Sequence, residues 1–401
     1  MTRPLRPGSR RPRRWAGPTA ALLVGLALAG CASSAPTPPA SAGSTTDLSS
    51  AGAPTAPTSA TATATQALVD LADPWRIAPP AAVGIDPDLL AAADTQAHDL
   101  GSVRSLVVVR HGVLVDARYL GGTTAATLDD VRSVTKSVTS LLVGIATADG
   151  TLGGPGERLD ALLRPPVTVP TGPKAAVTVA DLLTMRSGFE WDESTTAGYN
   201  AWATAPNQVD YLLDRPLAYE PGTRFTYDTA AVHLLSVGLS QAAGESTDAY
   251  ARRVLFDPLG FGADAWETDD QGFDNGGAGL AMRPIDIAKI GQLVLQHGRS
   301  GARQVVPAAW VSEITTDHVP LQTRLPPLGQ LDYGELWWLG AIGGDAVELA
   351  WGYRGQFIFI VPARDLVVVV TSVLDDPSID SDAEEIAAMD LIVNWVLPAV
   401  R

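Results

Sequence analysis

Ser133 and Lys136 are the residues whose types and spacing most clearly suggest chemistry, because they form the only Ser-x-x-Lys pattern in the chain. Residues 133–148 have the character of a helix, and one helical turn takes 3.6 residues, so both side chains lie on one face. A serine hydroxyl needs a neighbour to take its proton, and a lysine whose pKa is lowered can do this. The pattern predicts a nucleophilic serine, although an ordinary helix start, with serine as N-cap and lysine in solvent, would show the same four residues.

Alternating helical and strand-like segments must position this pair. Apolar spacing predicts helices over residues 86–100, 133–148, 179–185, 229–243, 247–256, 284–297 and 382–397. Strand-like runs occupy residues 104–120, with a hairpin at His111-Gly112, and residues 346–353, 356–362 and 366–374, whereas residues 151–176 have the composition of a loop. The order predicts an α+β fold: an antiparallel sheet flanked by helices, with an all-helical subdomain between its first and last strands.

The first 31 residues have the composition of an export signal. Residues 1–30 contain six arginines, no acidic residue and a short apolar run, and Cys31, the only cysteine, follows directly. The junction Leu28-Ala29-Gly30-Cys31 resembles a bacterial lipoprotein lipobox, which implies that residues 1–30 are a signal peptide and that Cys31 carries lipid. The alternative is an ordinary secreted protein with a free cysteine near its cleavage site. The export route, Sec or twin-arginine, stays open.

The segment after Cys31 is too polar to fold on its own. Residues 32–66 are almost entirely Ala, Ser, Thr, Pro and Gly, with Asp47 as the only charge. We therefore expect residues 31–73 to be a lipid-bearing, disordered tether and residues 74–401 to be one folded domain. The location predicted for that domain is the extracytoplasmic face of the cell membrane.

The charge balance limits the partners. The net charge is −16, and removal of residues 1–30 with their six arginines takes it to −22. An acidic domain of this kind is repelled by nucleic acid and by anionic lipid, so we expect no nucleic-acid partner and a membrane attachment that depends on the N-terminal lipid.

Several ordered motifs resemble the serine β-lactamase and penicillin-binding-protein superfamily over about residues 80–398. They are Ser133-x-x-Lys136, the segment 177–193, Tyr227-Asp228-Thr229 where class C enzymes have Tyr-x-Asn, the segment 277–298, and Tyr353-Arg354-Gly355 where the family places Lys-Thr-Gly or His-x-Gly. The chain is most similar to class C-like esterases and to 6-aminohexanoate-dimer hydrolase-like proteins. The resemblance implies a β-lactamase/transpeptidase-like fold and a serine hydrolase.

The resemblance also implies roles for single residues. Ser133 would form an acyl-enzyme, Tyr227 would relay a proton to the leaving group, and Lys136 would keep the tyrosine poised. The backbone N–H groups of Ser133 and Gln356 would form the oxyanion hole. Gly355 would leave room for the substrate next to them.

Two departures from the family motifs affect the predicted substrate. Thr229 replaces an asparagine and Tyr353 replaces a lysine, and both would support the substrate site. The changes argue against efficient β-lactam hydrolysis and fit small ester, amide or peptide substrates. The alternative is a penicillin-binding-type binder of cell-wall peptides, or a carboxypeptidase, with little or no turnover.

Other chemistries fit the sequence less well. The chain has no Gly-x-Ser-x-Gly, and its five histidines show no metal-ligand spacing, so we expect no metal and no cofactor. His233 is interpreted as a surface or core residue, and Asp269-Asp270 as a solvated loop. Five tryptophans near the predicted cleft suggest an aromatic pocket: Trp191, Trp202, Trp337, Trp338 and Trp351.

Overall fold

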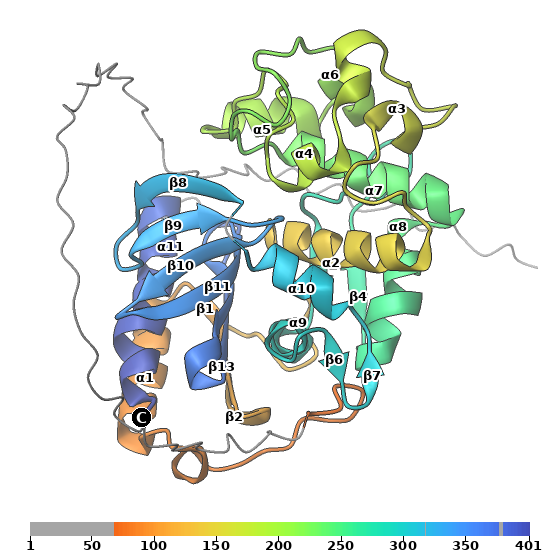
Figure 1. Cartoon of the computed structure of the whole chain (residues 1–401). Helices are drawn as coiled ribbons and strands as arrows, with labels where there is room; N and C mark the ends of the chain where they lie inside the picture. The colour runs from red at the N-terminus through yellow and green to blue at the C-terminus, as the bar shows by residue number, and fades with distance from the viewer. Residues whose placement is uncertain (1–67, 317, 377–379) are drawn as a thin grey trace, which may run out of the picture.

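An eight-stranded sheet forms the centre of the protein in the computed structural model, which describes residues 68–316, 318–376 and 380–401. Its order is β2-β1-β13-β12-β11-β10-β9-β8, and neighbouring strands are antiparallel (Figure 1). The strands are β1 (Val103–Arg110), β2 (Val113–Tyr119), β8 (Val319–Arg324), β9 (Gln330–Tyr333), β10 (Trp338–Ile342), β11 (Asp345–Gly352), β12 (Gln356–Val361) and β13 (Leu366–Ser372).

The first and last strands of the folded chain lie side by side, as predicted. β1 pairs with β13 along its length, and β1 and β2 form the expected hairpin. His111 and Gly112 both have positive φ angles, 53° and 66°, as a two-residue hairpin turn requires. The predicted fold class is therefore confirmed. The strands β8, β9 and β10 at the other edge were not predicted.

Helices cover both faces of the sheet and form a second layer beyond it (Figure 1). The helices are α1 (Pro87–Leu100), α2 (Val134–Asp149), α3 (Leu159–Leu162), α4 (Val179–Leu183), α5 (Thr196–Ala203), α6 (Gln208–Leu213), α7 (Thr229–Ala243), α8 (Thr247–Ala251), α9 (Pro284–Leu295), α10 (Ala308–Ile314) and α11 (Ser381–Asp390). α8 and α11 continue as the π-helical turns η3 (Arg252–Phe256) and η6 (Leu391–Val396). α1 and α11 lie on one side of the sheet, and α2, α9 and α10 lie on the other (Figure 1).

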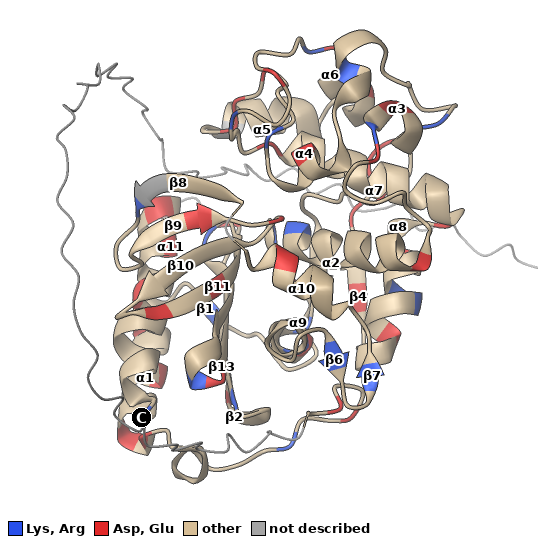
Figure 2. Ribbon diagram, in the orientation of Figure 1, with Lys and Arg blue, Asp and Glu red and all other residues tan. Residues whose placement is uncertain are grey.

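α3 to α8 form the helical subdomain above α2 (Figure 1). The predicted loop 151–176 is only partly irregular, because α3 and the 3-10 turn η2 (Gly172–Ala176) lie within it. Two smaller sheets complete the structure: β3 (Asp129–Asp130), β4 (Asp264–Trp266) and β5 (Leu280–Met282) form one, and β6 (Arg299–Ser300) and β7 (Arg303–Gln304) form the other. Acidic and basic residues are interspersed over both halves (Figure 2).

The folded part begins before the boundary predicted at residue 74. Leu71 is buried, and its N–H donates to Ser300 Oγ at 2.7 Å, while Gly301 N–H donates to Val69 O at 2.9 Å. Residues 69–71 thus belong to the fold, and the predicted signal segment and Cys31 lie outside the described residues. No helix among the described residues is both long and apolar enough to cross a membrane.

Candidate active site

α2 carries Ser133 and Lys136 through the interior of the protein. Almost all of its first thirteen residues are buried, so the helix is enclosed by the sheet on one side and the helical subdomain on the other. Ser133 occupies the N-cap position, but its side chain makes no capping hydrogen bond. The hydroxyl instead accepts a hydrogen bond from Lys136 Nζ at 2.9 Å. The ordinary helix start considered above therefore does not describe this serine.

The turn before α2 is tied to the sheet on one side. Asp129 accepts hydrogen bonds from Arg104 Nε on β1 at 2.9 Å and from Thr371 Oγ1 on β13 at 2.7 Å. Arg132 has a φ of 49°, which is uncommon for a residue with a side chain, and its N–H donates to Asp130 Oδ1 at 2.8 Å. These contacts fix the direction in which Ser133 leaves the turn.

Lys136 is buried, with 1% of its surface exposed. Besides Ser133, its ammonium donates to the carbonyl of Gly277 at 2.7 Å. Burial lowers the pKa of Lys136 to about 8, although the nearby carboxyls of Glu193 and Asp228 work in the opposite direction. A lysine with this pKa has a substantial neutral fraction near neutral pH, as a proton acceptor requires.

Tyr227 stands beside the pair at the start of α7. Lys136 Nζ lies 4.8 Å from the centre of its ring, and its hydroxyl hydrogen-bonds with Ser133. Burial raises the pKa of Tyr227 far above its usual range, the charge of Glu193 raises it further, and the Ser133 hydrogen bond lowers it. The structure thus brings the three predicted residues together but favours a neutral phenol. The expected role of Lys136, to keep this tyrosine poised as a proton relay, stays a prediction.

α7 begins immediately after Tyr227 because Asp228 caps it. The Asp228 carboxylate accepts from Ala231 N–H at 2.9 Å and from Ser187 Oγ at 3.3 Å. Burial raises the pKa of Asp228 to about 8, while its backbone donors lower it. The cap therefore holds a second buried acidic group close to Lys136.

Glu193 is a residue of the site for which the sequence predicted no role. It is 2% exposed, and its carboxylate accepts from Trp191 Nε1 at 2.7 Å, from Thr229 N–H at 2.9 Å and from Thr229 Oγ1 at 2.6 Å. Three donors to one carboxyl group suit an ionised carboxylate, which only accepts hydrogen bonds. Burial raises the pKa of Glu193, and the Lys136 charge is the largest influence that lowers it.

These contacts change the interpretation of Thr229. Its hydroxyl was expected to support the substrate, but Thr229 is buried and that hydroxyl donates to Glu193. Thr229 therefore anchors the carboxylate beside Lys136. The sequence did not predict that Thr229 lies next to Glu193, because helices α5 and α6 separate the two residues in the chain.

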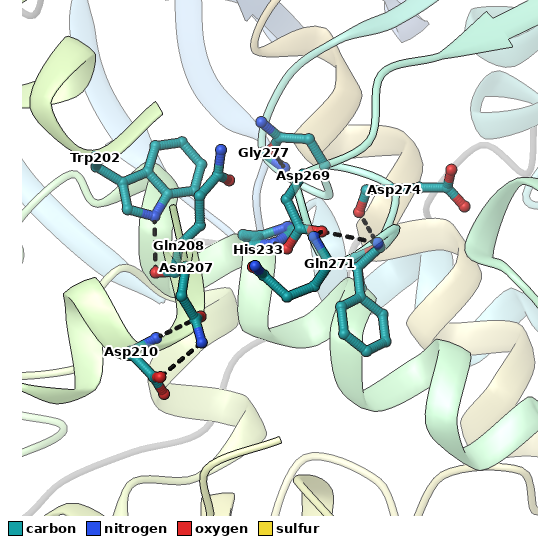
Figure 3. Close-up of polar contacts among 12 residues, drawn as sticks. Trp202, Asn207, Gln208, Asp210, His233, Asp269, Gln271, Asp274 and Gly277 are labelled. Atoms are coloured by element: carbon teal, nitrogen blue, oxygen red, sulfur yellow. Dashed lines mark hydrogen bonds and ion pairs between the residues drawn. The ribbon is translucent and has the colours of Figure 1, made fainter. Parts of the chain in front are cut away.

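A hydrogen bond within its own loop also fixes the position of Gly277. Asn275 Oδ1 accepts from Gly277 N–H at 3.0 Å. Close by, His233 Nε2 lies 3.1 Å from Asp269 Oδ2, and Figure 3 shows the two side chains next to each other near Trp202. Asp269 is buried, so its interpretation as part of a solvated loop was wrong, whereas His233 is a core residue.

Aromatic rings line the other side of Tyr227. Trp338 stacks on Tyr227 with ring centres 5.9 Å apart, and Trp351 lies 5.5 Å from Trp338. Of the five tryptophans named above, these two border the site. Trp191 reaches the site only through its hydrogen bond to Glu193, and Trp202 and Trp337 are buried in the core.

The strand that should complete the oxyanion hole approaches Ser133 at another residue than predicted. A Cβ on Gly352, the last residue of β11, would lie 2.3 Å from Val131 O and 3.3 Å from Arg132 Cβ. A Cβ on Gly355 would instead meet Ala388 of α11 at 2.6 Å. Gly352, not Gly355, therefore packs on the turn before Ser133. Gly355 is required by the turn between β11 and β12, where its φ is 80°, and by its contact with α11.

The neighbours of Gly355 also face away from Ser133. The Gln356 side chain bonds to Ser372 on β13, from Nε2 to the carbonyl at 3.2 Å and from the Ser372 N–H to Oε1 at 3.0 Å. Arg354 lies in the turn between β11 and β12, where its guanidinium contacts Glu384 of α11 at 3.2 Å. The Arg354 contact therefore lies on the α11 side of the turn. Tyr353 is half-buried.

Comparison with known proteins identifies the family. The Beta-lactamase family matches residues 92–391, about three quarters of the chain. The chain belongs to the Beta-lactamase family. No curated protein matches the sequence.

Solved structures share the fold of this Beta-lactamase family member at low sequence identity. A protein described as a 6-aminohexanoate-dimer hydrolase from Bacillus anthracis is 18% identical, with a TM-score of 0.64 over 75% of this chain and 80% of that chain. EstCE1, described as a hydrolase with promiscuous acyltransferase activity, is 17% identical, with a TM-score of 0.61 over 76% and 98%. A penicillin-binding protein from Bacillus halodurans is 16% identical, with a TM-score of 0.59 over 75% and 99%. The fold is thus that of β-lactamase-related serine hydrolases.

Proposed function

We propose that this protein hydrolyses ester or amide bonds through an acyl-enzyme on Ser133. The observation that carries the proposal is the buried Lys136 ammonium, which donates to Ser133 Oγ at 2.9 Å and has its pKa lowered to about 8. A nucleophile in contact with a base that can be neutral near pH 7 is the arrangement that acyl transfer needs.

Each catalytic role follows from the surroundings of the group. Neutral Lys136 takes the Ser133 proton as Oγ attacks the carbonyl carbon, and the Gly277 carbonyl holds the ammonium that results. Tyr227, neutral and in contact with Ser133, passes a proton to the leaving oxygen or nitrogen and takes one back from the Lys136 ammonium. Water then attacks the acyl-enzyme and gives a proton to neutral Lys136, and the Lys136 ammonium returns a proton to Ser133 Oγ as the acid is released, so that the net reaction is hydrolysis.

The oxyanion formed in the attack needs two fixed N–H donors. One is the backbone N–H of Ser133. For the second, we favour the N–H of Tyr353 over that of Gln356, because Tyr353 directly follows the glycine that packs on the Ser133 turn. Gln356 is paired with Gly352 in the ladder, and its side chain is directed to β13.

The deciding experiment is hydrolysis of p-nitrophenyl acetate and butyrate, with nitrocefin as a parallel substrate. We expect sustained turnover of the esters, a loss of at least about 10³-fold in Ser133→Ala and Lys136→Ala, and a smaller loss in Tyr227→Phe. Nitrocefin should be a poor substrate, since the triplet that ends at Gly352, Ala350-Trp351-Gly352, has no lysine. Ser133→Ala activity equal to wild type would refute the assignment of the nucleophile. One equivalent of p-nitrophenol without turnover would favour the peptide-binding alternative.

We also propose that the enzyme is exported and anchored to the cell membrane by lipid on Cys31. The support is the basic and apolar signal pattern that ends at the only cysteine. Labelling with a fatty-acid analogue in a bacterial host should mark the wild type, and Cys31→Ser should be unlabelled and released from the membrane fraction. Equal labelling of both chains would rule out Cys31 as the attachment site.

A further inference from the structure

Three potential metal ligands from separate segments meet near the end of α10. They are Glu313 of α10, His318 just before β8, and Glu335 between β9 and β10. One ligand atom from each lies within 4.8 Å of the others. His318 Nε2 is 3.5 Å from Glu313 Oε1, which is close to the ~3.4 Å between two ligands of a tetrahedral ion bound at about 2.1 Å.

Glu335 is the decisive member of this group. The residue is 4% exposed, and its Oε2 atom is buried without a hydrogen-bond partner in the described part of the chain. An unpaired buried carboxylate is costly, and a cation is one of the few partners that removes this cost.

The backbone holds the ligand segments against each other. His318 N–H donates to Tyr333 O at 3.2 Å, and a Cβ on Gly334 would lie 2.2 Å from Ile314 O. His318 Nε2 also hydrogen-bonds with the backbone carbonyl of Glu313 at 2.9 Å, and an ion bound through Nε2 would replace this hydrogen bond. Because the segments are already in contact, only small side-chain rotations are needed to converge on one ion.

We propose that Glu313, His318 and Glu335 bind a divalent transition-metal ion, and that Zn²⁺ fits this group best. One imidazole nitrogen and two carboxylates suit Zn²⁺, whereas Ca²⁺ and Mg²⁺ prefer oxygen ligands alone. A water molecule would fill the fourth position, because the Glu313 side chain is exposed to solvent.

The role of this ion is to fasten the segment between β9 and β10. In that segment the Leu336 carbonyl accepts from Ser137 Oγ at 2.7 Å, one residue after Lys136 in α2. The same segment leads directly into Trp338, which stacks on Tyr227. Zinc should therefore stabilise the fold at the base of the candidate active site without taking part in the reaction.

The test uses the full chain with Cys31→Ser and no histidine tag, so that neither the thiol nor the tag binds zinc. After treatment with EDTA, calorimetric titration with ZnSO₄ should give one ion per chain, and zinc should raise the melting temperature. His318→Ala and Glu335→Gln should each weaken binding by at least about tenfold and remove the melting shift. Mn²⁺ and Ca²⁺ are titrated in parallel.

Two variants serve as matched controls. His98→Ala removes an exposed histidine, and Glu348→Gln alters a half-buried carboxyl of β11 that lies outside the proposed site. Both should bind zinc as the parent does. The proposal is overturned if zinc does not bind, or if both site variants keep parental affinity. Tighter binding of Ca²⁺ than of Zn²⁺ would overturn the assignment of the metal. His318→Ala keeps the test decisive if Glu335→Gln does not fold, since His318 is partly exposed.

Discussion

Replacing Glu193 by glutamine should move the pH dependence of acylation toward lower pH. The negative charge of Glu193 raises the pKa of Lys136 against the larger effect of burial. Glutamine keeps the size of the side chain and removes that charge, so the pKa of Lys136 should fall. Since only neutral Lys136 can accept the Ser133 proton, more enzyme should be competent at neutral pH.

The size of the effect is bounded by the pKa of about 8. At pH 7, about 10% of the wild-type lysine is neutral, compared with about 0.03% for a lysine at its ordinary pKa. Glu193→Gln can therefore raise kcat/KM at pH 7 by at most about tenfold. At pH 9, where most of the wild-type lysine is already neutral, the substitution should give almost no gain.

The assay is the pH profile of kcat/KM for p-nitrophenyl butyrate between pH 5.5 and 9.5, corrected for spontaneous hydrolysis. Asp192→Asn serves as the matched control, because Asp192 is the adjacent carboxylate and is exposed. Its profile should overlay that of the wild type. A general loss of activity from disturbed contacts to Trp191 or Thr229 would lower the whole curve without moving it.

Two results would refute this reasoning. An ascending limb of Glu193→Gln that stays in place or moves to higher pH would show that the Glu193 charge does not act on the base. A wild-type profile that keeps rising above pH 9 and loses its limb in Tyr227→Phe would make the phenol the base, since burial raises the pKa of Tyr227.

Three further predictions test the supports of the site and the buried carboxyls. Gly352→Ala should lower kcat/KM by about 10²-fold, because its Cβ would lie 2.3 Å from a backbone oxygen of the turn before Ser133. Gly340→Ala on β10, whose Cβ would have 3.5 Å to its nearest neighbour, should leave kcat/KM almost unchanged. Equal activities of the two variants would contradict the proposed contact. Trp338→Ala should lower the free energy of unfolding, measured by urea titration, by about 3–5 kcal/mol, because Trp338 packs on Tyr227. Trp338→Phe keeps a ring at this position and should lower it by less. Equal losses in the two variants would exclude ring stacking as the cause. Burial raises the pKa of Asp228 from 3.8 to about 8, so the folded chain binds more protons than the unfolded chain between these pH values. The free energy of unfolding should therefore fall from pH 5 to pH 8. A free energy of unfolding that rises over this range would contradict the prediction.

The sequence predicted the fold well where local patterns coincide with tertiary contacts. The hairpin at His111-Gly112, the valine-rich β13 and the capped helices α1 and α4 each carry their own signal, and the structure contains all of them. The edge strands β8 to β10 were missed because residues 319–342 mix proline, glycine and charge, and their strand structure depends on pairing with β11.

Residue spacing alone predicted the candidate site only where a motif is local, whereas Tyr227 was found through the family resemblance. Ser133 and Lys136 are one helical turn apart, so their contact follows from helix geometry. Glu193 and Gly277 reach Lys136 from distant segments, and no spacing rule connects them. The same limit applies to Glu313, His318 and Glu335, because the prediction of no metal considered only the spacing of the histidines.

The register of β11 shows a different limit. Tyr353-Arg354-Gly355 was chosen because it ends in glycine, as the triplet of the family motif does. Trp351-Gly352 also ends in glycine, and this glycine stands three residues earlier. Both glycines lack space for a Cβ, so a sequence rule about crowding cannot separate them. The two differ in what they approach: Gly352 meets the turn before Ser133, and Gly355 meets α11.

The position of Thr229 explains how this family member can differ from the Tyr-x-Asn motif and still hold its tyrosine. In this chain the residue two positions after Tyr227 donates both its N–H and its hydroxyl to Glu193. Glu193 in turn places a negative charge near Lys136, where it raises the lysine pKa while burial lowers it. A short hydroxyl side chain suits this contact because it can reach a carboxylate that its own backbone N–H already holds. Thr229 and Glu193 therefore form one hydrogen-bonded unit beside Lys136, and its charge acts on the pKa of the proposed base.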